Sequence, residues 1–316
     1  MERQYSVVPH SVSSDTEALL SFYPLPGFGM IPVNAFLIRA AEPVLVDTGI
    51  LSESEAFMEG LESVIDIEDI RWVWLTHTDP DHIGSLSRIL RQAPEARVVT
   101  TFLGMGKLIL SGLPPDRAYL INPGQSLDVG DRELRAFRPP TFDAPESTGF
   151  FDTKAEILFS VDSFGAAVNG PVQNAADISA EDLREGLIAW TSLDVPWLNQ
   201  VPAERFNQAL NTVRDFRPRM ILSSHLPPAE GMMDVLIDNV LAAREVPPFV
   251  GPDQAEMMKM MASMNPWRRA MSPVLMSVAF VMCWNSCNSF SAFFLLNGMS
   301  SLIPFLSFFS SSMKRK

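Results

Sequence analysis

Short apolar runs that end in a charged residue or a histidine recur along the first 230 positions of the chain. Their length and their content of Val, Ile and aromatic residues are typical of buried strands, and we expect such strands at about 43–47, 71–76, 157–162 and 220–225. Amphipathic stretches between the early runs predict helices at about 52–64, 82–92 and 102–111. This alternation predicts an α/β sandwich with helices on the outside.

Other elements follow from the same pattern. Residues 33–39 and 43–47 predict a β-hairpin, and further short strands are expected at 98–100, 118–121 and 133–138. The Pro- and Gly-rich stretch at 22–30 is interpreted as a loop that precedes the first strands. Residues 163–217 are expected to be mostly helical, and a last domain helix is expected at about 229–243.

The end of the chain differs in composition from the rest. Pro247, Pro248 and Pro252 mark a break, so we predict a domain at 1–246, a linker at 247–269 and an apolar tail at 270–316. Residues 270–313 contain no charged residue and are flanked by basic ones. Two interpretations stay open for the tail: a membrane-inserted hairpin or a non-native extension.

The charge is concentrated in the predicted domain. The whole chain carries −13, but all five charged residues from Arg268 onward are basic, which leaves residues 1–267 at −18. Such a domain repels phosphate backbones and argues against a nucleic-acid partner. The two cysteines, Cys283 and Cys287, lie in the tail, and the N-terminal residues lack an apolar signal core. We therefore expect a cytoplasmic protein, with membrane association through 270–313 as an alternative.

The densest chemical signal is the hexapeptide from His77 to His82, which directly follows a predicted strand. It holds two of the four histidines of the chain together with two aspartates. A turn followed by a helix cap would account for Asp79, Pro80 and Asp81 but gives no reason for the two histidines. Metal binding accounts for all of them.

Two more strands end in residues of the same kind. The run at 157–162 ends in Asp162, and the run at 220–225 ends in His225. The run at 43–47 also stops at a polar sequence, Asp-Thr-Gly. Polar side chains at strand ends with apolar residues behind them are how α/β folds build sites, so we expect His77, Asp162 and His225 to converge.

These motifs resemble a known superfamily. The pattern His77-x-Asp79-x-Asp81-His82 resembles the His-x-His-x-Asp-His signature of the metallo-β-lactamase superfamily. It is most similar to the His-x-Glu-x-Asp-His form of the flavodiiron and related oxygen-binding di-iron proteins. A second similarity to these proteins lies in two later segments, Asp143-Ala-Pro-Glu-Ser and, after it, Leu-Phe-Ser-Val-Asp-Ser-Phe-Gly at 158–165. The resemblance covers roughly residues 20–245 and implies an αββα sandwich.

The resemblance also implies a ligand set for two metals. One metal is expected at His77, Asp79 and the residue at 143, where the family has histidine and this chain has Asp143. Glu146 is the alternative if Asp143 does not reach the metal. The second metal is expected at Asp81, His82 and His225. Asp162 is expected to bridge both metals.

Carboxylate-rich sites with histidine favour iron, while zinc and manganese remain alternatives. The leading hypothesis is a non-haem di-iron protein that binds or reduces O₂ or nitric oxide. The alternatives are a metal-dependent hydrolase of an ester, thioester or lactone, in which Asp81 would be catalytic, and a non-catalytic O₂ sensor. No flavodoxin-like segment follows, so we expect no bound flavin and a separate electron-donor protein. A homodimer is left open.

Overall fold

The computed structural model of the protein describes residues 7–25, 29–113 and 115–263. The strands are β1 (Val8–Ser11), β2 (Thr16–Leu20), β3 (Phe22–Leu25), β4 (Gly29–Pro32), β5 (Ala35–Ile38), β6 (Val44–Val46), β7 (Trp72–Trp74), β8 (Arg97–Thr100), β9 (Ala118–Leu120), β10 (Ser126–Asp128), β11 (Glu133–Phe137), β12 (Gly149–Asp152), β13 (Ile157–Phe159), β14 (Met220–Ser223) and β15 (Leu226–Glu230). The α-helices are α1 (Ser54–Glu62), α2 (Leu86–Gln92), α3 (Phe102–Leu110), α4 (Ala180–Asp194), α5 (Ala203–Phe216), α6 (Met233–Ala243) and α7 (Gln254–Ser263).

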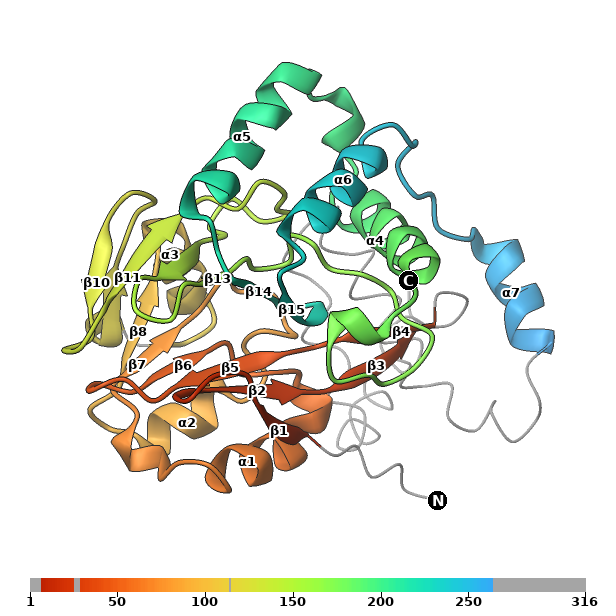
Figure 1. Cartoon of the computed structure of the whole chain (residues 1–316). Helices are drawn as coiled ribbons and strands as arrows, with labels where there is room; N and C mark the ends of the chain where they lie inside the picture. The colour runs from red at the N-terminus through yellow and green to blue at the C-terminus, as the bar shows by residue number, and fades with distance from the viewer. Residues whose placement is uncertain (1–6, 26–28, 114, 264–316) are drawn as a thin grey trace, which may run out of the picture. The chain divides into compact units, whose positions relative to one another are not determined.

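Two large β-sheets form the centre of the fold. The first has the strand order β1-β2-β5-β6-β7-β8-β9, the second has the order β10-β11-β12-β13-β14-β15, and β3 and β4 form a small separate hairpin. Figure 1 shows α1 and α2 on the outer side of the first sheet and α4, α5 and α6 over the second. This αββα sandwich confirms the fold predicted from the sequence.

Alternation along the strands explains why the sheets are covered on both faces. In β6, Val44 and Val46 belong to the core between the two sheets, whereas Leu45 lies between them in sequence and faces the helices. In β13, Phe159 joins the core between the sheets and Leu158 packs toward α4, α5 and α6. Strands that are apolar on both faces need cover on both sides, and the helices provide it.

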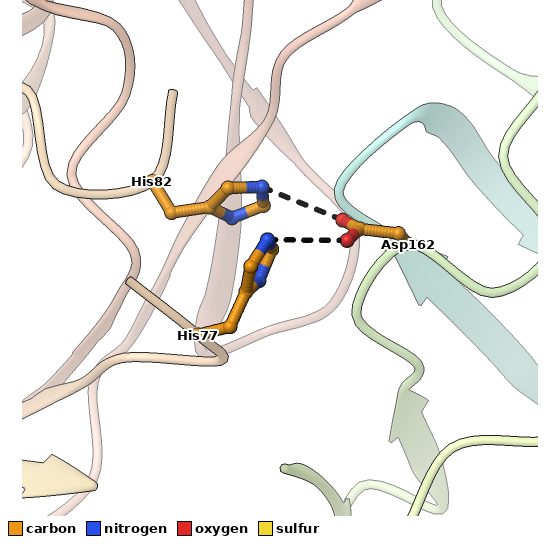
Figure 2. A group of neighbouring side chains, drawn as sticks. All are labelled: His77, His82 and Asp162. Carbon is orange, nitrogen blue, oxygen red and sulfur yellow. Dashed lines mark ion pairs between the residues drawn. The ribbon is translucent and has the colours of Figure 1, made fainter. Parts of the chain in front are cut away.

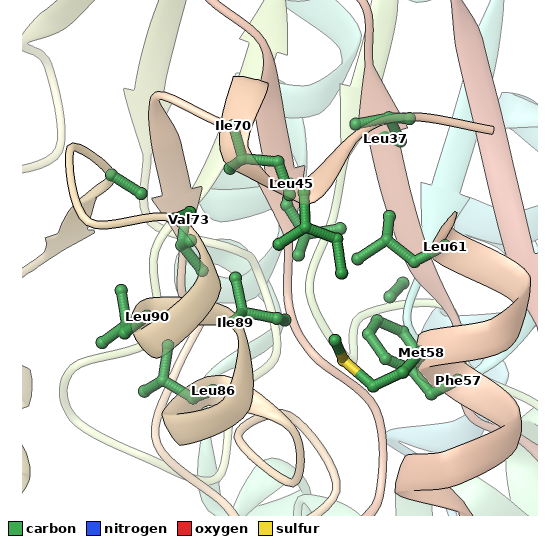
Figure 3. Packing of buried hydrophobic residues seen from close by; sticks show 14 of the residues in the cluster. Leu37, Leu45, Phe57, Met58, Leu61, Ile70, Val73, Leu86, Ile89 and Leu90 are labelled. Atoms are coloured by element: carbon green, nitrogen blue, oxygen red, sulfur yellow. The ribbon is translucent and has the colours of Figure 1, made fainter. Parts of the chain in front are cut away.

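The outer core of the first sheet shows how the helices are attached. Phe57, Met58 and Leu61 of α1 pack with Leu37 and Leu45 of the sheet (Figure 3). Leu86, Ile89 and Leu90 of α2 belong to the same cluster and are labelled in Figure 3. The spacing of three and four residues on each helix produces the apolar stripe that the sequence analysis used to predict these helices.

Parallel pairing brings several strand ends to one edge. Strands β6, β7, β8 and β9 run parallel within the first sheet, and β13 and β14 run parallel within the second. Val46 pairs with Trp74, and Phe159 pairs with Leu222, so the segments that follow these strands start beside each other. The loops after these strands carry the candidate functional residues.

Three sequence predictions about elements were wrong in detail. The helix expected at 82–92 begins only at Leu86, whereas 163–217 is mostly helical as predicted, through α4, α5 and short 3-10 turns. The chain forms strands from Val8 onward, so residues 22–30 are not simply a loop before the first strand. The segments 77–85 and 163–179, which follow β7 and β13, form turns and loops before the next α-helix begins.

The third correction concerns the start of the predicted helix at 229–243. The structure has the strand β15 at Leu226–Glu230, and α6 begins at Met233. Pro227 and Pro228 lie in this strand, which is the last in its sheet. Proline is tolerated in edge strands because their outer side needs no ladder hydrogen bond, but it hides the strand from pattern analysis.

The chain divides after Val250, and beyond that point the structure describes only the segment through α7. The predicted linker at 247–269 and tail at 270–316 therefore stay predictions, and the tail lies outside the described residues. Among the helices that are described, none is long and apolar enough to cross a membrane.

Gly84 offers a test of how tightly the loop after β7 is packed. A Cβ atom at this position would lie 2.3 Å from Leu51 N and 2.5 Å from Gly49 O, both backbone atoms. We expect Gly84→Ala to destabilise the protein by about 1–3 kcal/mol in chemical denaturation, because neither backbone can give way easily.

Gly106→Ala is the matched control, since nothing lies within 4 Å of its added Cβ on α3. Replacing a helical glycine by alanine should leave stability unchanged or raise it by about 0.5–1 kcal/mol. Equal effects of the two substitutions would show that the loop around Gly84 is not closely packed.

Candidate metal centre

All seven residues predicted as ligands lie at one place in the structure. His77, Asp79, Asp81 and His82 lie in the turns that follow β7. Three groups of side chains offer ligand atoms within 4.8 Å of one another: His77, His82 and Asp162; Asp81, His82 and His225; and His77, Asp79 and Asp143. Every predicted residue is in at least one group, so the structure brings together the complete predicted set.

Asp162 lies between the imidazoles, as Figure 2 shows for two of them. Its Oδ2 atom lies 3.3 Å from His77 Nε2. Its Oδ1 atom faces the other two rings, 3.4 Å from His82 Nε2 and 3.1 Å from His225 Nε2. The two oxygens of one carboxylate therefore face two different sets of partners, which is the arrangement of a carboxylate able to bridge two ions.

The remaining aspartates flank this centre on two sides. Asp81 Oδ2 lies 3.6 Å from Nε2 of both His82 and His225. Asp143 Oδ1 lies 3.9 Å from His77 Nε2. The histidines and Asp162 are at most 3% exposed, whereas the side chains of Asp81 and Asp143 are 16% and 27% exposed. The centre is thus buried on the side of Asp162 and reaches solvent on the side of Asp81 and Asp143.

Glu146, the sequence-based alternative to Asp143, has a different role in the structure. Its Oε1 atom accepts hydrogen bonds from Thr78 Oγ1 at 2.7 Å and from Lys107 Nζ at 2.5 Å. Thr78 lies between two of the candidate ligands, so Glu146 connects α3 to the ligand loop. This geometry favours Asp143 as the ligand and Glu146 as a support for the loop.

Asp47 contacts the candidate centre, although the sequence analysis did not assign it. It follows β6, and its carboxylate accepts hydrogen bonds from Thr76 N at 2.8 Å and from Thr76 Oγ1 at 2.7 Å. Its Oδ2 also lies 2.8 Å from His82 Nδ1. The sequence signal was a strand that stops at Asp-Thr-Gly, but only the fold places this aspartate behind His82.

Hydrogen bonds at Nδ1 fix the orientation of two of the rings, those of His82 and His225. His225 Nδ1 lies 2.7 Å from Pro32 O, a carbonyl that can only accept, so Nδ1 carries the proton. The carboxylate of Asp47 likewise accepts from His82 Nδ1. The Nε2 atoms of both rings face carboxylate oxygens. Burial alone would lower the pKa of both imidazoles, but the neighbouring carboxylates outweigh it and raise the pKa, so the centre favours a positive charge, from a proton or a metal ion, at this position.

Two buried atoms show the same need directly. His82 Nε2 and Asp162 Oδ1 are inaccessible, and among the described residues neither makes a hydrogen bond of good geometry, although Asp162 Oδ1 lies 3.1 Å from His225 Nε2. Two ligands about 2.1 Å from one ion lie roughly 3.0–3.4 Å apart, a spacing close to that found around Asp162. The donor set, its spacing and the unpartnered atoms therefore fit a metal.

The electrostatics of the centre reflect many carboxylates in a small volume. Burial and neighbouring carboxylates raise the pKa of Asp79 to about 6. Burial and neighbouring carboxylates also raise the pKa of Asp143 to about 7, although the His77 imidazole opposes the shift. Burial alone would raise the pKa of Asp162, but the imidazoles of His77 and His82 and the nearby His225 outweigh it and hold the pKa below its usual range. A bound cation would remove the repulsion that drives the first two shifts.

The backbone at the strand ends is held in an uncommon conformation. Asp47 has a φ of 57°, and Val161, directly before Asp162, has a φ of 60°. A β-branched residue in this left-handed region is a true outlier. Hydrogen bonds from Ser224 N at 2.9 Å and Ser223 Oγ at 3.1 Å to Val161 O hold it in place. Such strain, when held by the surroundings, is typical of a functional site.

Comparison with known proteins identifies the family of the chain. Residues 31–225 match the family model described as "ODP family beta lactamase". The chain is also 31% identical over 134 residues to the anaerobic nitric oxide reductase flavorubredoxin of Salmonella typhi, a match that covers 42% of this chain and 28% of that protein. Three further curated relatives, among them the type A flavoprotein fprA of Rhodobacter capsulatus, are matched over 23–32% of their length. The chain thus corresponds to about a quarter to a third of these relatives.

Solved structures show the same fold. The rubredoxin oxygen:oxidoreductase of Desulfovibrio gigas aligns with a TM-score of 0.66 at 18% identity, covering 75% of this chain and 61% of that one. The flavodiiron protein of Giardia intestinalis aligns with a TM-score of 0.66 at 18% identity, covering 76% and 60%. At this identity the likeness concerns the fold.

The contact between Asp47 and His82 can be tested by titration. We expect Asp47→Asn to lower the affinity for Fe²⁺ or Zn²⁺ by about 10- to 100-fold, because the amide no longer supports the His82 Nδ1 proton with a negative charge. A competition titration of the metal-free protein with a chromogenic chelator measures the change.

Asp116→Asn is the control, because Asp116 is exposed and lies in another loop. It should bind metal like the unmodified protein. Equal affinities for all three proteins would contradict a supporting role for Asp47.

Proposed function

This chain belongs to the ODP family of β-lactamase-fold proteins, and on this premise we propose that it is a non-haem di-iron protein that binds or reduces O₂ or nitric oxide. The observation that carries the proposal is the Asp162 carboxylate, whose two oxygens face different imidazoles. A carboxylate in this position can serve two ions at once. The names of two similar proteins, a nitric oxide reductase and an oxygen oxidoreductase, support the choice of substrate class.

We assign the ligands in two sets. In the first set His77, Asp79 and Asp143 hold one iron, since their ligand atoms form one group. In the second set Asp81, His82 and His225 hold the other iron. Asp162 would contribute one oxygen to each set. The open side of the centre lies near Asp81 and Asp143, whose side chains are partly exposed, and a diatomic substrate would enter there.

The donor atoms support iron over zinc. The seven proposed ligands are three imidazoles and four carboxylates, and no cysteine lies among them. Zinc in proteins favours low coordination numbers with imidazole and thiolate, whereas carboxylate-rich sites with histidine suit iron or manganese. When bound, paired ferrous ions supply redox chemistry and open coordination positions for the substrate.

The protein's own residues prepare the centre for this chemistry. Asp47 and the Pro32 carbonyl keep the protons of His82 and His225 on Nδ1, so that each Nε2 points inward. The buried histidines exclude water from the Asp162 side. Electrons come, in this proposal, from a separate electron-donor protein.

The first test is the metal content of the full-length chain purified without oxygen, followed by an absorption spectrum on adding air or nitric oxide. We expect about two irons per chain and a new near-ultraviolet or visible band. Two zincs and no spectral change would overturn the proposal and favour the hydrolase, in which Asp81 orients the attacking water. One metal per chain would contradict the bridge.

Two substitutions separate the roles of the ligands. Asp162→Ala should reduce the metal content to well below two per chain, because both sets lose a ligand. His225→Ala should cost about one of the two metals, because this residue belongs to the second set alone. Metal analysis after gel filtration measures both effects.

His10→Ala is the matched control for histidine removal, since His10 lies in β1 and is in none of the candidate metal groups of the described residues. It should keep the full metal content. Full retention by Asp162→Ala would disprove the bridge, and full retention by His225→Ala would disprove its assignment.

A further inference from the structure

Ser163 makes three hydrogen bonds to a single residue of another loop. Its Oγ–H donates to Thr141 O at 2.7 Å, and its Oγ accepts from Thr141 N at 3.1 Å. Because the Ser163 proton is used in the first of these bonds, Thr141 Oγ1–H is the donor in the third bond, at 2.8 Å. Both residues are at most 3% exposed, and the hydrogen bonds described for Thr141 all go to Ser163.

The two residues belong to the two segments that carry Asp162 and Asp143. Ser163 directly follows Asp162, and Thr141 lies two residues before Asp143. One segment follows β13, whereas the other lies between β11 and β12. The three hydrogen bonds therefore attach the loop of a first-set ligand to the turn that carries the carboxylate shared by both sets.

The turn that carries Asp162 is itself held firmly. Ser160 Oγ donates to Ser163 O at 3.0 Å, and Ser163 N donates to Ser160 O at 3.2 Å. Gly165 N donates to Asp162 O at 3.0 Å. Ser160 N donates to Leu222 O of β14 at 2.9 Å, which anchors the turn to the second sheet. Ser163 thus offers a fixed point for the attachment of the other loop.

The loop of Asp143 is held at a second point by Arg138. The Nη1 atom of Arg138 donates to Pro145 O at 2.6 Å and to Ser147 O at 2.8 Å. Asp143 lies in neither a helix nor a strand, and its side chain is 27% exposed. Its position beside the metal centre therefore depends on these two attachments, of which the one at Ser163 reaches the centre itself.

We propose that Ser163 is a positioning residue, whose hydroxyl group holds the loop of Asp143 where Asp143 and Asp162 can bind the same metal ion. The inference rests on the proposed function, in which these two carboxylates share the first iron. Without the hydroxyl group His77 keeps its place after β7, but the loop that brings Asp143 to within 3.9 Å of it is released on one side. Ser163 would then control the occupancy of one metal position out of two.

The test titrates the metal-free, full-length protein with Co²⁺, whose visible absorption depends on its ligands, and counts the bound ions by equilibrium dialysis. Ser163→Ala removes all three hydrogen bonds. Thr141→Val keeps the shape of the side chain but removes the third bond, whereas Thr141→Ser keeps the hydroxyl group. Ser63→Ala is the matched control, because it also removes a hydroxyl group that donates to a backbone carbonyl, Gly60 O at 2.7 Å, directly after α1.

We expect the unmodified protein, Thr141→Ser and Ser63→Ala to bind two Co²⁺ ions alike. In Ser163→Ala one ion should bind with unchanged affinity and the other about 10- to 100-fold more weakly, the range usual when a group that supports a ligand is lost. Thr141→Val should weaken the same ion by a smaller factor, since two of the three hydrogen bonds remain.

A double-mutant cycle with Asp143→Ala separates positioning from a general loss of stability. If Ser163 acts through Asp143, Ser163→Ala should weaken binding no further once Asp143 has been removed, because both substitutions remove the same ligand. A purely structural role would make the two effects add, and additive effects would overturn the inference. Unchanged affinities in Ser163→Ala, or an equal loss of both ions from the folded variant, would overturn it as well.

Thr141→Val and Thr141→Ser keep the inference testable if Ser163→Ala does not fold, since equal Co²⁺ affinities of these two variants would overturn it. The proposed function can fail separately. An unmodified protein that binds two Co²⁺ ions but, when loaded with iron, does not react with O₂ or nitric oxide would overturn the proposed function and leave the role of Ser163 in metal binding intact.

Discussion

One carboxylate, that of Asp162, is the point on which the centre depends. Three histidines from two sheets turn their Nε2 atoms toward its two oxygens, at 3.1–3.4 Å. The contacts behind the rings support this orientation, because Asp47 and the Pro32 carbonyl accept hydrogen bonds from Nδ1 of His82 and His225 and leave each Nε2 facing Asp162. Even the unfavourable φ of Val161 belongs to this arrangement, since it sets the direction of the next side chain.

The protein contains two acidic clusters that are neutralised in different ways. Arg132 has a fully buried side chain, and its guanidinium forms ion pairs with Asp15, Asp131 and Asp152. At the metal centre, the ion pairs described for Asp81, Asp143 and Asp162 are all with histidines. The first cluster is complete within the chain, whereas the second gathers more negative charge than its imidazoles can offset, which is what a site for cations requires.

Much of this site could be predicted from sequence because its ligands follow strands or lie within one hexapeptide. His77, Asp162 and His225 were predicted from apolar runs that end in a ligand, and this signal is local. Asp47 could not be assigned in this way, because its place behind His82 depends on a contact with a residue far away in sequence. The same limit explains the missed strand β15, whose two prolines are acceptable only because the strand lies at an edge.

The division of the ligands between two sheets has a consequence for the stability of the whole fold. The hexapeptide from His77 to His82 follows strand β7 of the first sheet, while Asp162 and His225 follow strands β13 and β14 of the second. Ions held at this centre would act as cross-links between the two layers, and their binding energy would add to the energy that keeps the layers closed. The resistance of the folded domain to proteases would then depend on the iron supply of the cell.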